Sequence, residues 1–214
     1  MQKYDLENKK ITTSIFIFPL FMILLMASVK LFEIKSGLNF TIYGVFPRES
    51  KGLIGIFLCP FIHNSTQHLL NNLIPLFFLL SAIIHFYSKL SYLIYIHIHF
   101  SSGLLLWFIG REAFHIGASG VLYGLVSFMF FSGVFSKNTQ LLAFALLITF
   151  LYGSMVWGIF PETVKEGVSW EAHLSGSIIG FILSIIFIKK GPQRKKYDWE
   201  DEEEIEYIYE VVDT

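Results

Sequence analysis

The sequence predicts an all-α, polytopic membrane protein with six transmembrane helices. Of its 214 residues, 54% are hydrophobic and 15% are charged, and the mean hydropathy is +0.58. A soluble domain carries about a quarter charged residues, so this composition favours a membrane protein. A helix needs about 20 mostly apolar residues to cross the hydrocarbon core. Six segments fit this requirement, at residues 12–29, 68–87, 90–109, 117–133, 140–160 and 173–188.

The spans differ in how they begin. The first contains no charged residue, follows Lys3, Lys9 and Lys10, and is followed by no small-x-small cleavage site. We therefore expect a retained helix rather than a signal peptide.

The third and fifth spans are apolar segments that alternate with the second, fourth and sixth spans, which all open with polar residues. The fourth is short, at about 17 residues or 25 Å of helical rise, and we expect its neighbours to shield it.

The chain divides into residues 1–11, a bundle over residues 12–190, and an acidic tail over residues 191–214. An even number of spans puts both termini on one side, and ten of the 16 Lys and Arg residues fall on that side. Cytoplasmic loops carry the excess of Lys and Arg, so we expect cytoplasmic termini. We also expect the membrane to be a bacterial inner membrane. The first loop, residues 33–65, is apolar and is expected to lie in the membrane interface. The tail holds nine of the 17 acidic residues and is expected to be solvated.

Several function classes are excluded by composition. A net charge of −1 gives no basic footprint for nucleic acid. Cys59 is the one cysteine, which rules out a disulfide framework and a multi-cysteine metal site. His97 and His99 are two positions apart and would point to different sides of a helix. The sequence also contains no internal repeat that would favour an inverted-repeat transporter.

Polar residues gather at the start of the second, fourth and sixth spans. The second begins His63-Asn64-Ser65-Thr66-Gln67-His68, and Asn72 lies four residues after His68 on the same helix face. Asn71 is of the same type but lies off that face. The fourth span begins with Ser119 and the sixth with His173. Because all three spans run inward from the non-cytoplasmic side, we expect these side chains at similar depth. Polar groups within spans are costly and mark functional candidates.

Small residues predict how two of these spans pack. Gly120 and Gly124 form one G-x-x-x-G pattern, and Gly176 and Gly180 form another. Such patterns let helix backbones approach closely in lipid. A close crossing of the fourth and sixth spans would bring Ser119 and His173 together, with the ring of Tyr123 one turn below.

This arrangement predicts acyl-transfer chemistry. A serine hydroxyl needs a base to become a nucleophile, and His173 is the candidate base. A developing oxyanion needs donors, which the backbone N–H of Ser119 and the side chains of His68 and Asn72 could supply. We expect Glu171 to face the loop, so the prediction is a Ser–His dyad without a third member.

The three motifs together resemble those of rhomboid intramembrane serine proteases of the compact six-helix type. The matching pieces are His63-x4-His68-x3-Asn72, Gly117-Ala118-Ser119-Gly120 with Tyr123, and Ala172-His173-x2-Gly176-x3-Gly180. The resemblance covers residues 41–188. It implies a nucleophile (Ser119), a general base (His173), oxyanion donors (His68, Asn72), a backbone contributor (Gly117), a stacking ring (Tyr123) and a structural loop partner (His63).

The resemblance also implies hydrolysis of a peptide bond in or near a transmembrane segment of another protein, without metal or cofactor. Substrates would enter between Leu73, Pro75 and Phe77 on one side and residues 152–157 on the other, with residues 161–170 as a cap. Some family members carry a Trp-Arg pair in the first loop, where this chain has Phe46-Pro47-Arg48-Glu49. The alternative is an inactive relative that binds client helices. Inactive relatives usually lack the serine or the histidine, and this chain has both. Oligomeric state is left open.

Overall fold

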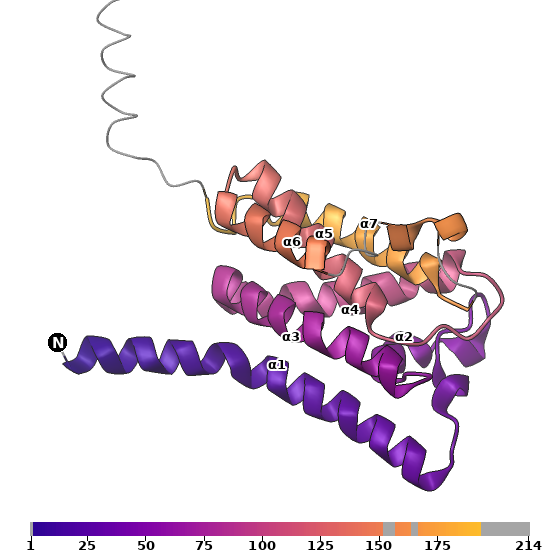
Figure 1. The fold of residues 1–214 in the computed structure, drawn as a ribbon. Coiled ribbons are helices and arrows are strands. Elements are labelled where there is room, and N and C mark those ends of the chain that lie inside the picture. Colours follow the sequence, from indigo (N-terminus) through magenta and orange to yellow (C-terminus); the bar gives the residue numbers. More distant parts are fainter. Residues whose placement is uncertain (1, 152–156, 164–166, 194–214) are drawn as a thin grey trace, which may run out of the picture.

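The computed structural model describes residues 2–151, 157–163 and 167–193. In these ranges the protein is all-helical and contains no β-strand (Figure 1). The α-helices are α1 (Gln2–Ser36), α2 (Gly55–Leu58), α3 (Thr66–Tyr87), α4 (Ser91–Ile109), α5 (Ser119–Phe135), α6 (Thr139–Leu151) and α7 (Trp170–Ile186). Short 3-10 helices are η1 (Phe40–Tyr43), η2 (Ser50–Gly52), η3 (Cys59–Phe61), η4 (Ser88–Leu90), η5 (Trp157–Ile159) and η6 (Pro161–Thr163). Six of the α-helices correspond to the six predicted spans, which confirms the fold class.

α1 is longer than predicted at both ends. It continues through Lys30 and Glu33 to Ser36, so the first loop begins at Gly37 rather than near residue 33. Lys30 Nζ lies 2.7 Å from Glu33 Oε2, and Glu33 Oε1 accepts a hydrogen bond from the backbone N–H of Phe40. The two charges therefore neutralise each other inside the protein, and the helix can continue through them.

The fifth predicted span is wrong at its C-terminal end. α6 is described to Leu151, and by Trp157–Ile159 the chain has turned into the 3-10 helix η5. The carbonyl of Gly158 in η5 bonds a side chain of α7 instead of a helical N–H. The remaining spans begin and end within three residues of their predicted positions.

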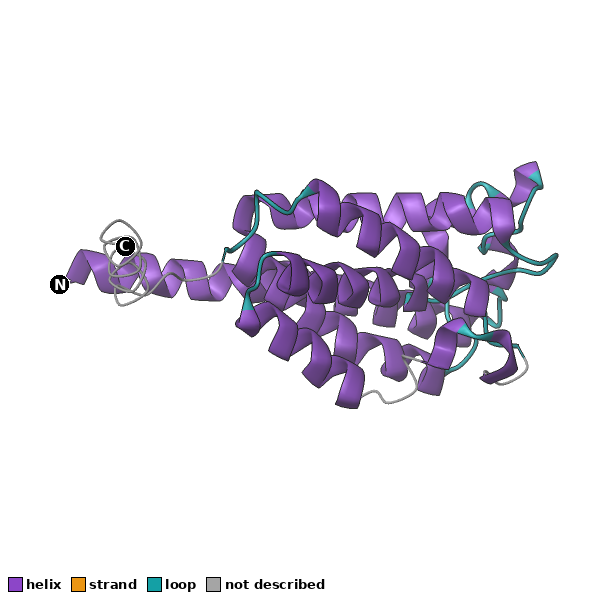
Figure 2. Cartoon of the chain, turned by 90° about the horizontal axis from the view of Figure 1, so that it is seen from above, coloured by secondary structure: helices purple, strands orange, loops and turns teal. Residues whose placement is uncertain are grey.

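α5 is the central helix of the bundle and contacts α3, α4, α6 and α7. Leu125, Phe128 and Met129 of α5 are completely buried. α1 lies at the edge, beside α3, and its N-terminal part projects beyond the other helices (Figures 1 and 2). α1, α3 and α4 contain stretches long and apolar enough to cross a membrane, and α5, α6 and α7 are shorter apolar helices.

The first loop is fixed to the C-terminal end of α4. Arg48 N–H donates to the carbonyl of Trp107 at 3.0 Å, and the indole N–H of Trp107 donates to the carbonyl of Glu49 at 3.0 Å. Arg48 Nη1 also donates to the carbonyl of Gly110 at 2.9 Å. A tryptophan and an arginine from different segments thus anchor the loop in a chain that lacks an adjacent Trp-Arg pair.

Candidate functional site

Ser119 and His173 meet where α5 and α7 begin. Ser119 is the first residue of α5, and His173 lies in the first turn of α7. His173 Nε2 is 2.9 Å from Ser119 Oγ, within hydrogen-bond range. Two residues 54 positions apart in the sequence are therefore in direct contact.

The other ring nitrogen of His173 identifies the tautomer. Nδ1 lies 2.7 Å from the carbonyl oxygen of Gly158. A carbonyl can only accept, so Nδ1 carries the hydrogen and the neutral ring presents an unprotonated Nε2. The hydroxyl of Ser119 then donates to Nε2. The ring of Tyr123 stacks on the imidazole with centroids 4.1 Å apart and planes 5° from parallel, which fixes the ring's orientation.

Glycines allow this contact. A Cβ atom at Gly176 would overlap the carbonyl oxygen of Gly120, and one at Gly180 would overlap that of Gly124. The backbones of α5 and α7 therefore touch over two turns directly below Ser119 and His173. Any side chain larger than hydrogen at Gly176 would force the two helices apart.

Gly117, His68 and His63 lie together on the α3 side of Ser119. Gly117 has a φ of 103°, in the left-handed region that favours glycine. A Cβ there would lie 2.8 Å from His68 Nε2, so the imidazole packs directly on this backbone. The ring of His63 meets that of His68 edge to face at 4.9 Å. Burial lowers the pKa of His63 to about 3, and the ring stays neutral.

Asn72 and Asn71 behave differently. Asn72 is buried, and its Nδ2 donates to the carbonyl of His68 one turn earlier at 2.7 Å. Asn71 is exposed and accepts a hydrogen bond from Gln67. One amide hydrogen of Asn72 is thus used within the helix, and the second is the hydrogen it could offer to a ligand.

These side chains border a cleft of about 1160 Å³. His68 and Asn72 line it from α3, Ser119 and Tyr123 from α5, and His173 from α7. The cleft is large enough to admit an extended stretch of polypeptide together with water.

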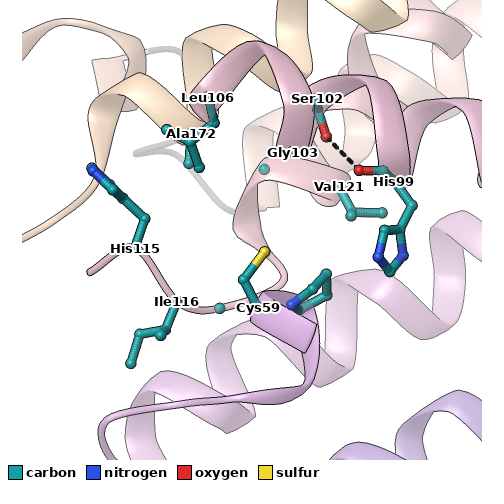
Figure 3. A pocket seen from close by; sticks show the side chains of 12 residues that line it. Cys59, His99, Ser102, Gly103, Leu106, His115, Ile116, Val121 and Ala172 are labelled. Carbon is teal, nitrogen blue, oxygen red and sulfur yellow. Dashed lines mark hydrogen bonds between the residues drawn. The ribbon is translucent and has the colours of Figure 1, made fainter. Parts of the chain in front are cut away.

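A second, much smaller cavity of about 20 Å³ is lined in part by Cys59, His115 and Ile116 (Figure 3). Cys59, His99 and Ser102 line it, and this volume is enough for about one water molecule. Burial raises the pKa of the Cys59 thiol to about 12. Since a thiolate is the reactive form of cysteine, burial makes the Cys59 thiol a poor nucleophile.

Glu171 is a correction to the sequence analysis. Its side chain is buried rather than facing the loop, and both carboxylate oxygens lie 2.8 Å from Nη1 of Arg111. Arg111 Nη2 also donates to the carbonyl of Val168 at 2.9 Å. Ser169 caps α7 by accepting from the N–H of Ala172, and it bonds His115 Nδ1 at 2.6 Å. The start of α7 is therefore tied to the α4–α5 connection.

No local pattern in the sequence marks the pairing of Arg111 with Glu171. Lys30 and Glu33 were also missed, although their spacing of three on an apolar helix is a recognisable signal for an ion pair. Of the expected entry gate, residues 152–156 lie outside the described residues. In the described ranges, no three His, Cys, Asp or Glu side chains gather in a way that could hold a metal ion.

Comparison with known proteins finds a family model and several relatives that match this chain. The family model of the Rhomboid domain matches residues 50–190. An uncharacterized protein of Mycobacterium tuberculosis (strain ATCC 25618 / H37Rv) is 31% identical over 176 residues, covering 78% of this chain and 72% of that protein. A putative rhomboid protein of Acanthamoeba polyphaga mimivirus is 30% identical over 148 residues, covering 66% and 80%. RHOMBOID-like protein 1 of Arabidopsis thaliana is 28% identical over 137 residues, covering 62% and 34%.

Proposed function

Since this chain belongs to the rhomboid family of integral membrane proteins, we propose that it is an intramembrane serine endopeptidase. It hydrolyses peptide bonds in or near the transmembrane segments of other membrane proteins. The observation that carries the proposal is the 2.9 Å contact between Ser119 Oγ and His173 Nε2, with Nδ1 held by the carbonyl of Gly158. A packing serine would not need a base in the correct tautomer beside it.

The reaction follows from these contacts. His173 Nε2 removes the hydroxyl proton as Ser119 Oγ attacks the carbonyl carbon of the peptide bond. The imidazolium that forms keeps its Nδ1–H bonded to Gly158, and the π face of Tyr123 stabilises the positive charge. The imidazolium then returns the proton to the leaving amine as the C–N bond breaks. A water molecule from the cleft, deprotonated by His173, hydrolyses the resulting ester.

The oxyanion has donors on two sides. Ser119 is the first residue of α5, so its N–H has no intrahelical partner, and we assign Gly117 the role of shaping the backbone beside it. His68 and the free amide hydrogen of Asn72 face the same cleft. Removal of one such donor in a soluble hydrolase costs about 10²–10³-fold in rate.

The membrane orientation is part of the proposal. We place both termini, residues 1–11 and 191–214, in the cytoplasm of a bacterial cell, with the bundle over residues 12–190 in the inner membrane. The excess of Lys and Arg on the side of the termini supports this orientation. The cleft then opens toward the non-cytoplasmic surface, where water can enter.

The test combines labelling with cleavage. The purified full-length protein is reconstituted in liposomes with a model single-span substrate that has a small residue before the expected cut. The wild type should label with a fluorophosphonate and cleave the substrate, whereas Ser119→Ala and His173→Ala should do neither while remaining folded. Ser132→Ala removes another buried serine of α5 and serves as the matched control. Cleavage by Ser119→Ala, or the absence of labelling in the wild type, would refute the proposal and favour a non-catalytic helix-binding protein.

A further inference from the structure

Asn64 makes a contact that the proposed reaction does not use. It lies just before Ser65, the N-cap of α3, and its Oδ1 is 3.0 Å from Nδ1 of His68. The opposite edge of the same ring, Nε2, packs on Gly117. Asn64 therefore holds the imidazole at Nδ1, while Nε2, the atom proposed to donate to the oxyanion, lies beside Gly117 at the cleft.

The backbone of Asn64 is held by a residue of another helix. Lys30 of α1 donates from Nζ to the carbonyl of His63 at 2.8 Å and to that of Asn64 at 3.3 Å. Its ammonium also pairs with Glu33, and both side chains are only 10% exposed. A buried ammonium needs such acceptors. The segment that carries Asn64 is thus tied to α1 by hydrogen bonds that span more than 30 residues of sequence.

We propose that Asn64 is a positioning residue for His68, and that Lys30 fixes the backbone from which Asn64 reaches the ring. This inference rests on the proposed protease function, because it concerns the donor role of His68. The inference also assigns a role to the ion pair in α1, because Lys30 of that pair connects α1, at the edge of the bundle, to the oxyanion site.

The hydrogen bond has a consequence for protonation. An amide oxygen only accepts, so Nδ1 of His68 carries a hydrogen. A neutral ring then has no hydrogen on Nε2, and His68 donates to an oxyanion from Nε2 only as an imidazolium. The titratable and charged groups around it are His63 in the loop, Lys30 on α1, Arg111 in the α4–α5 connection and His173 on α7. None of these is an anion beside the ring, and the Lys30 ammonium opposes a second positive charge there. Asn64 Oδ1 is the neighbouring acceptor that favours the protonated form.

The first experiment compares Asn64→Leu with Asn64→Asp. Asn64 is exposed in the cleft, so neither variant should unfold the protein. Asn64→Leu should lower kcat about tenfold, the value of roughly one hydrogen bond, with little change in KM. It should also move the basic limb of the kcat/KM pH profile to lower pH. Asn64→Asp keeps an acceptor at the same place, and should retain kcat and move that limb to higher pH.

The second experiment concerns Lys30. Lys30→Met alone would leave Glu33 buried and unpaired, so the informative variant is Lys30→Met with Glu33→Gln. It should remain folded and lower kcat as Asn64→Leu does, and Lys30→Arg should retain activity. Adding Asn64→Leu to the double variant should cost little more, because residues that act through one contact are not additive.

The outcomes separate the two proposals. Failure of the wild type to cleave would refute the protease function itself. Cleavage by the wild type, together with an unchanged kcat and an identical pH profile in Asn64→Leu, would refute the positioning role alone. Full additivity between the Lys30 and Asn64 changes would show that Lys30 does not act through Asn64 and would overturn that part of the inference.

Discussion

Gly176→Ala is expected to inactivate the protein through packing alone. Gly176 touches no substrate in the proposed reaction, but a Cβ there would overlap the carbonyl oxygen of Gly120 on α5. The two backbones are already in contact, and neither can yield as a flexible side chain would. The added methyl group must therefore push α7 away from α5.

The size of the effect follows from the geometry of the dyad. Ser119 Oγ and His173 Nε2 are 2.9 Å apart, and about 1 Å of helix separation carries them beyond hydrogen-bond range. A misplacement of that size costs roughly 10²-fold in rate. Overpacking costs about 1–3 kcal/mol of stability, and the better helix propensity of alanine returns only about 0.5–1 kcal/mol. The variant should therefore be somewhat less stable and far less active.

The assay measures kcat/KM on the model substrate in liposomes, and thermal unfolding is measured separately on the purified protein in detergent. Gly103→Ala is the matched control, because its Cβ would lie 3.1 Å from the Cγ2 methyl of Ile56 and 3.4 Å from the Ile56 backbone, which is tight but is not the overlap that a Cβ at Gly176 makes. The control should retain activity and unfolding temperature. Wild-type activity in Gly176→Ala would refute the argument that the α5–α7 backbone contact sets the distance between Ser119 and His173.

Asn72→Ala should lower kcat by about 10²–10³-fold, less than His173→Ala, because the other oxyanion donors remain; the reverse order in the cleavage assay would contradict this role. Arg111→Met leaves the buried carboxylate of Glu171 unpaired. Loss of one member of a buried pair costs about 3–5 kcal/mol, and because Arg111 is partly exposed we expect the low end, seen as a lower unfolding temperature; an unchanged temperature would show that the pair does not secure α7. Because burial lowers the pKa of His63 to about 3, the unfolded chain binds a proton there first as the pH falls. The contribution of His63 to stability should therefore be constant above about pH 6.5 and decrease between about pH 6.5 and 3; His63→Gln should make the decrease in this range shallower than in the wild type, and identical profiles would refute it.

The fold and the positions of Ser119 and His173 could be predicted because their signals are local. Hydropathy depends on neighbouring residues, and each of the three motifs lies within one short segment. The two G-x-x-x-G patterns also indicated which helices would touch. The contact between serine and histidine then followed from two short patterns without knowledge of the loops between them.

The supporting contacts could not be predicted because they join distant segments. A prediction based on charges ends the first span before Lys30, because a charged residue is costly in the membrane. The carbonyls of His63 and Asn64, to which Lys30 donates, explain why it can be buried. Glu171 lies next to a loop in the sequence, and its partner Arg111 is 60 residues away. From a single sequence one can identify the charged groups that need a partner when buried, but not the residues that supply that partner.

The hydrogen-bond acceptor that orients His173 is a main-chain atom, the carbonyl of Gly158. Side-chain replacement at that position leaves the oxygen in place but still disturbs the site, because a Cβ at Gly158 would overlap the hydroxyl oxygen of Tyr123 and lie 3.2 Å from Nδ1 of His173. The hydrogen bond to Nδ1 can also be lost by displacement of the peptide unit alone. Any change that pulls η5 away from α7, such as strain in the connecting segment or a helix inserted between the two, would weaken the imidazole as a base even though no side chain has been changed.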